Sequence, residues 1–207
     1  MGVKTIYSEE TVPIGYQKIG NKLYENNDVL PIIYATSDTY SEEKFDELAF
    51  PATLDTIYNN VVVANGDNQY QSQIKELKLD YLINKQSSNL HITALKSGYR
   101  VNTKGKGVLQ LDLNQNFENQ IMIIEFDIDK VKYLKTRDTS ITINGIKNKL
   151  SSSSAAYPNG NNHFTYVISQ NEPLSDLQIE FSSGRYDVLN IKLYSLDYNV
   201  IKNRNSQ

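Results

Sequence analysis

Hydrophobic residues recur at every second position through much of the chain after residue 76. Leu109, Leu111 and Leu113, for example, alternate with Gln110 and Asp112. Because successive side chains of a β-strand point to opposite faces, each such run predicts a strand with one buried face. Similar runs occupy residues 77–83, 141–143, 164–168, 177–181 and 189–193. Many short strands separated by turn residues are typical of an antiparallel sandwich or barrel, and not of alternating strands and helices.

Two pairs of runs are close enough in sequence to predict β-hairpins. Asn144-Gly145 follows one short hydrophobic run, and this dipeptide readily adopts the positive φ angles of a type I′ turn. Residues 99–103 and 108–113, joined by the loop 104–107, predict a second hairpin. Residues 151–162 contain four serines and the run Tyr-Pro-Asn-Gly-Asn-Asn, a composition that predicts an exposed loop.

The first 60 residues follow a different pattern. Ser41 suits the N-cap of a helix, because Glu42 and Glu43 would then place acidic side chains in its first turn. Pro51 suits the first turn of a second helix. The hydrophobic residues that would share one face of this second helix are Leu54, Ile57, Tyr58 and Val61. We therefore expect two short helices in tandem.

Together these patterns predict a mainly β protein. We expect an antiparallel, jelly-roll-like β-sandwich over residues 73–203, with a small α+β portion over residues 1–72 packed on it. At 207 residues the chain can bury one generous hydrophobic core. Its longest apolar runs, such as residues 121–124, fall far short of the ~20 residues of a membrane span, so the polypeptide as given is not expected to cross a membrane.

Composition and motifs exclude several classes of function. The net charge of −3 provides no basic footprint, which argues against nucleic acid as a partner. Without cysteine the chain has no disulfides, thiolate chemistry or sulfur-ligated metal sites. It contains no phosphate-binding loop, dinucleotide-binding glycine motif, nucleophile elbow or zinc-protease motif. We therefore predict no catalytic apparatus and no cofactor.

Histidines and carboxylates offer only weak alternatives. His91 and His163 lie far apart in sequence, and neither belongs to a recognisable motif. Asp127 and Asp129 would point to the same side of a strand, where they would supply two of the several oxygen ligands that Ca²⁺ requires. A solvated strand face is the simpler interpretation. A hydrolase remains an alternative, and it would need two carboxylates ~5–10 Å apart across an open cleft.

Some tyrosine and arginine residues have the chemistry of a sugar-binding surface. Such surfaces combine flat aromatic faces with hydrogen-bonding side chains. The candidates are Tyr99, Arg100, Tyr157, Arg185 and Tyr186. Packing within the sandwich is the alternative for each tyrosine, since aromatic rings also dominate protein cores.

Three short motifs follow one another closely near the start of the chain: VPIGY at residues 12–16, LYEN at 23–26 and LPIIY at 30–34. With the expected helix at 41–48 and the Phe50-Pro51 pair, they resemble the outer domain of the YfhO family of bacterial multi-pass membrane proteins. Residues 191–198 resemble the C-terminal outer segment of the same family. The motif residues are Leu23, Tyr24, Glu25, Asn26 and Pro31, for which we favour a structural role.

This resemblance implies a place in cell-wall chemistry. Members of the family resemble membrane-embedded glycosyltransferases that use polyprenyl-phosphate sugars to glycosylate polymers such as lipoteichoic acid. Their catalytic acid is expected in loops near the membrane, so no catalytic residue is carried over to this chain. We expect a non-catalytic domain on the extracytoplasmic face of the bacterial membrane.

The expected partners are the protein's own transmembrane region and a cell-wall glycopolymer. The domain would bind or position the acceptor glycan, or brace the membrane part. The alternative is a stand-alone carbohydrate-binding module stabilised by calcium, and the absence of tryptophan counts against it.

Overall fold

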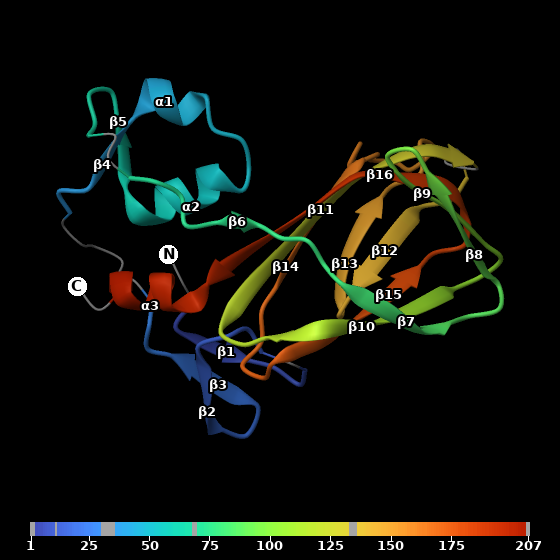
Figure 1. Ribbon diagram of the computed structural model, residues 1–207, viewed down its shortest axis with the longest axis horizontal. Helices are drawn as coiled ribbons and strands as arrows, with labels where there is room; N and C mark the ends of the chain where they lie inside the picture. Colours follow the sequence, from blue (N-terminus) through green and yellow to red (C-terminus); the bar gives the residue numbers. More distant parts are fainter. Residues whose placement is uncertain (1–2, 11, 30–35, 68–69, 133–135, 206–207) are drawn as a thin grey trace.

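The computed structural model describes residues 3–10, 12–29, 36–67, 70–132 and 136–205, and two antiparallel sheets packed face to face dominate it (Figure 1). The five-stranded sheet runs in the order β13 (Ile146–Leu150), β12 (Thr139–Ile143), β15 (Leu174–Phe181), β10 (Gly107–Phe117) and β7 (Tyr81–Gln86). The six-stranded sheet runs in the order β14 (His163–Ile168), β11 (Gln120–Lys132), β16 (Gly184–Asp197), β9 (Gly98–Thr103) and β8 (Leu90–Leu95), and β6 (Lys75–Glu76) also pairs with β16. The predicted mainly β sandwich is confirmed.

The hydrophobic core lies between the two sheets and follows the predicted alternation. On β10, Leu109, Leu111 and Leu113 are buried while the residues between them are partly exposed. Tyr166 on β14 is fully buried, and its hydroxyl donates a hydrogen bond of 2.9 Å to the carbonyl of Ile141 on β12. This bond joins the two sheets and satisfies the one polar atom of a large aromatic side chain.

One predicted hairpin is confirmed and the other is wrong. β12 and β13 pair around Asn144 and Gly145, whose φ angles of 45° and 84° are both positive, as a type I′ turn requires. β9 and β10, in contrast, belong to different sheets, because β9 pairs with β8 and β16 while β10 pairs with β7 and β15. Alternation shows which side chains are buried, and it does not show which strand supplies the hydrogen-bonding partner.

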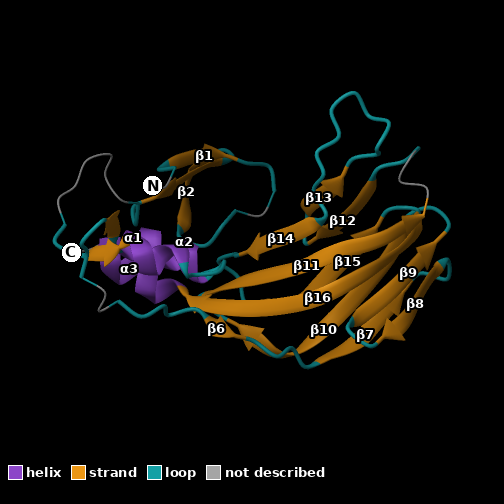
Figure 2. Cartoon of the chain, turned by 90° about the horizontal axis from the view of Figure 1, so that it is seen from above, coloured by secondary structure: helices purple, strands orange, loops and turns teal. Residues whose placement is uncertain are grey.

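The N-terminal residues form small elements at one end of the sandwich. β1 (Thr5–Tyr7), β3 (Leu23–Asn26) and β2 (Tyr16–Gly20) make a three-stranded antiparallel sheet, and β4 (Thr39–Ser41) pairs in parallel with β5 (Val61–Val63). Figure 2 shows α1 (Glu42–Asp46), α2 (Ala52–Asn59) and α3 (Tyr198–Asn205) gathered at this end. None of the helices in the described part of the chain has the length and apolar composition needed to cross a membrane.

The two predicted helices are present, with Ser41 and Pro51 at their N-cap positions. The burial of α2 is the opposite of what its apolar spacing suggests. Leu54 and Ile57 are 45% and 50% exposed, whereas the helix buries Asp55, Thr56 and Asn59. The reason is a set of hydrogen bonds: the Asp55 carboxylate accepts from the Ser72 hydroxyl at 2.7 Å and from the Gln73 amide at 2.8 Å.

Side-chain hydrogen bonds also attach the three-stranded sheet to the sandwich. The Asn171 side chain, between β14 and β15, accepts from the Gly15 amide at 3.0 Å and donates to the Tyr16 carbonyl at 2.7 Å. On α3, the Tyr198 hydroxyl donates to the Asp28 carboxylate at 3.1 Å. Specific polar contacts therefore connect the two portions that we propose, residues 1–72 and 73–203.

Candidate ligand-binding cavity

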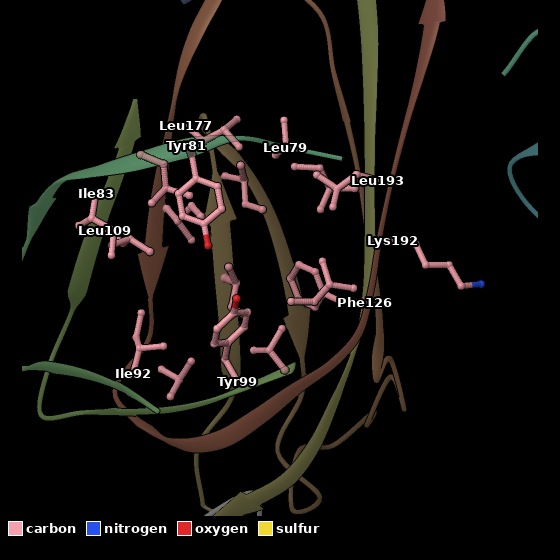
Figure 3. Close-up of a pocket in the computed structure, with 18 of the residues that line it drawn as sticks. Leu79, Tyr81, Ile83, Ile92, Tyr99, Leu109, Phe126, Leu177, Lys192 and Leu193 are labelled. Atoms are coloured by element: carbon pink, nitrogen blue, oxygen red, sulfur yellow. The ribbon is translucent and has the colours of Figure 1, made fainter. Parts of the chain in front are cut away.

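A cavity of about 710 Å³ lies between the two sheets and is bordered by both (Figure 3). We call it the inter-sheet cavity. Its walls combine deeply buried core residues such as Leu111 and Phe126 with residues of the edge strands β7 and β8. Most of its lining side chains are apolar.

The edge strands leave the inter-sheet cavity open. β7 ends the five-stranded sheet and β8 ends the six-stranded sheet, and residues 87–89 connect them. Tyr81 and Ile83 line the cavity from β7, yet they are 39% and 59% exposed. Sandwich interiors are normally close-packed, so inward-facing side chains with this exposure mean that the two sheets do not close on each other here. The opening gives solvent, and a ligand, access to the space between the edge strands.

Two tyrosines face each other within the inter-sheet cavity. Figure 3 shows the rings of Tyr81 and Tyr99 projecting into it with their hydroxyl groups directed toward one another. Interaction with the Tyr99 hydroxyl is the first cause that raises the pKa of the Tyr81 hydroxyl, and burial is the second. Tyr99 is 39% exposed. The pair therefore presents two accessible aromatic rings and a polar group among apolar walls.

Charged residues of the inter-sheet cavity lie on or next to β6 and on β16. Glu76, Lys78 and Lys192 contribute to its lining. Figure 3 shows the Lys192 side chain directed away from the interior, and its ammonium group lies 3.6 Å from a carboxylate oxygen of Glu125. The charged lining thus belongs to the periphery, and the interior contains mainly apolar side chains together with the Tyr81 and Tyr99 hydroxyls.

The sequence-predicted neighbours Tyr99 and Arg100 point to opposite faces of β9. The Arg100 guanidinium donates to both carboxylate oxygens of Asp187, which is 1% exposed. These hydrogen bonds hold the pKa of Asp187 below its usual range. The Lys130 ammonium lies 3.6 Å from the same carboxylate. Arg100 is therefore engaged in an ion pair, while Tyr99 lines the inter-sheet cavity.

The remaining predicted sugar-binding residues are not brought together. Tyr186 is fully buried, and burial raises the pKa of its hydroxyl, which donates to the Ser182 carbonyl at 3.4 Å. It packs in the core, the alternative that its sequence left open. Arg185, its neighbour, is exposed on the other side of β16. Tyr157 is 92% exposed in the loop 151–162.

The Asp127 carboxylate contacts protein groups that the sequence alone does not reveal. Its carboxylate accepts from the Asn190 side chain at 2.8 Å and lies 2.8 Å from Nδ1 of His163, directly opposite on β14. These contacts, that of Asn190 foremost, lower the pKa of Asp127. Asp129 is exposed on the same strand. Across the described residues, no three or more His, Asp or Glu side chains are grouped to hold a metal ion.

The predicted family motif occupies β3, the middle strand of the three-stranded sheet. Leu23 is 37% exposed and Tyr24 is partly buried. Glu25 lies 3.6 Å from the ammonium group of Lys4, and the buried Asn26 side chain accepts from the Asp28 amide at 2.8 Å. These contacts fit the structural role that we favoured. Pro31 lies outside the described residues.

Comparison with known proteins identifies one family. The family model described as "Bacterial membrane protein YfhO" matches residues 9–207. No curated protein matches the chain.

Three solved structures are distantly similar to the chain, and two of them are named as carbohydrate binding modules. CpGH89CBM32-6 produced by Clostridium perfringens is 11% identical over 60% of this chain and 94% of its own, with a TM-score of 0.28. CBM6cm-2 from Cellvibrio mixtus lichenase 5A, in complex with cellotriose, is 13% identical over 54% and 89%, with a TM-score of 0.29. A family 35 module from Clostridium thermocellum is 15% identical over 59% and 98%, also at 0.29. Scores this low support no inference about this chain.

Proposed function

Because the chain belongs to the YfhO family of bacterial membrane proteins, we propose that it is a non-catalytic, extracytoplasmic part of a membrane glycosyltransferase-like protein. It binds the acceptor glycan of a cell-wall polymer, such as lipoteichoic acid, and positions it for the membrane-embedded part. The observation that carries this proposal is the open inter-sheet cavity with its facing tyrosines, Tyr81 and Tyr99.

The chemistry of the tyrosine pair suits a sugar ring. Sugar-binding sites combine a few placed polar groups with apolar and aromatic surfaces. Tyr81 and Tyr99 supply both, since each ring is accessible and each hydroxyl can donate or accept a hydrogen bond. A sugar that enters between the edge strands would form hydrogen bonds between its own hydroxyl groups and the two tyrosine hydroxyls.

The composition of the cavity favours binding over hydrolysis. Glycoside hydrolysis usually needs two carboxylates on either side of the scissile bond. Of the described residues that line the inter-sheet cavity, only Glu76 carries a carboxylate. This observation supports a role in holding a glycan.

Exposed apolar side chains near the helices support contact with the membrane-embedded part. Leu54 and Ile57 on α2 are 45% and 50% exposed, and Val61 and Val63 on β5 are 43% and 37% exposed. Apolar side chains that stay exposed on a folded chain can mark a protein or membrane contact. These residues would brace the chain against the rest of the protein.

A titration of glycan and teichoic-acid fragments against the chain, read by backbone amide chemical shifts, tests glycan binding. We expect the largest shifts on β7 and β9, with loss of binding in the Tyr81→Ala/Tyr99→Ala double variant. Tyr157→Ala is the matched control, because Tyr157 is exposed in a loop and is not part of the cavity lining.

Two results would count against this proposal. If no fragment changes the backbone amide chemical shifts at millimolar concentration, glycan binding would be refuted and only the bracing role would remain. Shifts confined to the loop 151–162, abolished by Tyr157→Ala, would place the glycan on a different surface.

A further inference from the structure

The deep walls of the inter-sheet cavity contain hydrocarbon groups. Leu109, Leu111, Phe126, Ile141 and Leu177 line it, and each is between 1% and 7% exposed. They come from both sheets, since β10, β12 and β15 belong to one and β11 to the other. A ligand that reaches these walls would touch carbon atoms almost exclusively.

A sugar does not match these deep walls. Each sugar hydroxyl moved there would lose its hydrogen bonds to water, and a polar group buried without a partner is costly. The Tyr81 and Tyr99 hydroxyls are the polar groups that the figure places within the cavity (Figure 3). They can satisfy one sugar ring beside them and cannot satisfy a second one deeper in the sandwich.

We propose that the deep part of the inter-sheet cavity binds the aliphatic chain of an amphiphilic molecule, a fatty acid or the acyl chain of a lipid. This inference rests on the proposed function for the location of the ligand, and it deepens that function by assigning the ligand a hydrocarbon part. The aliphatic chain of the ligand lies against the leucine and isoleucine walls. The polar part of the ligand lies beside the tyrosine pair or at the charged periphery.

The size and edges of the inter-sheet cavity fit such a molecule. Its 710 Å³ falls within the range of roughly 300–1,000 Å³ that is typical of small-ligand sites. Removing an aliphatic chain from water is favourable in proportion to the apolar area buried. Lys78 and Glu76 border the same cavity, so a polar headgroup at this edge would remain near water and charged partners.

The chain with ¹³C-labelled leucine, isoleucine and valine methyl groups tests this proposal. The probes are laurate, dihexanoyl phosphatidylglycerol and dodecyl maltoside, each below its critical micelle concentration, and maltose as the sugar without an aliphatic chain. We expect the three amphiphiles to shift the methyl resonances of Leu109, Leu111 and Ile141 and to raise the melting temperature, with maltose leaving these methyls unchanged. Tighter binding of laurate would indicate a free fatty acid, and tighter binding of the phospholipid would indicate a lipid.

A blocking variant and a matched control test where the aliphatic chain of the ligand binds. Ala94 lines the inter-sheet cavity from β8 and is exposed, so Ala94→Trp fills the cavity without replacing a buried core residue. Leu82 is on the edge strand β7, is 66% exposed and is not part of the lining. We expect Ala94→Trp to weaken laurate binding at least tenfold, by about 1.4 kcal/mol, and Leu82→Trp to leave it unchanged.

The outcomes separate this inference from the proposed function. Maltose shifting the deep methyls as strongly as dodecyl maltoside would overturn the aliphatic assignment while supporting glycan binding. If the protein binds laurate and none of the glycan fragments, this result would support the aliphatic assignment and refute glycan binding. Amphiphile shifts confined to Leu54 and Ile57 on α2, or equal binding by Ala94→Trp and Leu82→Trp, would show surface adsorption and overturn the inference.

Discussion

The guanidinium group of Arg100 on β9 donates hydrogen bonds of 2.7 and 2.9 Å to the two carboxylate oxygens of Asp187 on β16, its direct partner in the strand register. Asp187 is 1% exposed, so removing the guanidinium would leave a buried charge with poor compensation. We expect Arg100→Ala to lower the urea concentration at the unfolding midpoint clearly at pH 7. Arg185→Ala, which removes an exposed arginine from β16, should leave the midpoint nearly unchanged, and equal effects of the two variants would contradict this role.

The same ion pair predicts that the stability of the fold depends on pH. The hydrogen bonds from Arg100 lower the pKa of Asp187 in the folded chain, so the pair stabilises the fold above the unfolded pKa of about 3.9. This stabilisation is lost as the pH falls through the folded value. Unfolding curves from pH 7 to pH 2.5 should show the difference between wild type and Arg100→Ala shrinking toward the acid end. A constant difference would mean that Asp187 does not titrate as described.

The buried polar face of α2 makes Asp55 the anchor of that helix. Its carboxylate accepts hydrogen bonds from Ser72 and Gln73. Asp55→Ala would remove the partner of both donors, and each donor that stays buried would then lower the free energy of unfolding by about 1–3 kcal/mol. We expect faster hydrogen exchange along α2 and at the Gln73 amide. Leu54→Ala, on the exposed face of the same helix, should change stability by no more than about 0.5 kcal/mol. Similar exchange in both variants would contradict the anchoring role.

Two glycines with similar backbone conformations should respond differently to alanine. Gly15 and Gly145 have φ angles of 91° and 84°, a region that costs a residue with a β-carbon about 1–2 kcal/mol. A β-carbon at Gly145 would meet open space, whereas one at Gly15 would overlap the hydroxyl of Tyr198. Urea unfolding should therefore show Gly15→Ala as the more destabilising variant. Equal losses would mean that the Tyr198 side chain moves aside freely.

The exposed apolar face of α2 predicts a contact that the isolated chain does not need. We expect the Leu54→Ser/Ile57→Ser double variant to unfold nearly as wild type does, because both side chains are about half exposed. In the full-length protein, the same variant should increase hydrogen exchange on α2 by releasing it from the membrane-embedded part. Identical exchange of wild-type α2 in the isolated chain and in the full-length protein would refute the bracing contact.

Local patterns predicted the elements whose causes are local. The alternation of Leu109, Leu111 and Leu113 marked a strand, because side-chain direction follows from backbone geometry alone. Asn144 and Gly145 marked a hairpin, since few residues adopt two positive φ angles in succession. The family-like motifs near the N-terminus were equally visible, and the family model covers residues 9–207.

The candidate site and the strand partners depend on contacts between residues distant in sequence. Tyr99 lines the inter-sheet cavity and Tyr186 is buried in the core, although both are strand tyrosines beside an arginine. The inter-sheet cavity is bordered by β7 and β8, the edge strands of two different sheets, and α2 turns its aspartate inward because Ser72 and Gln73 donate hydrogen bonds to it there. Periodicity reports the orientation of a side chain along its own strand or helix. The neighbour that it meets is set by sheet order and register, which the packing of the whole chain determines.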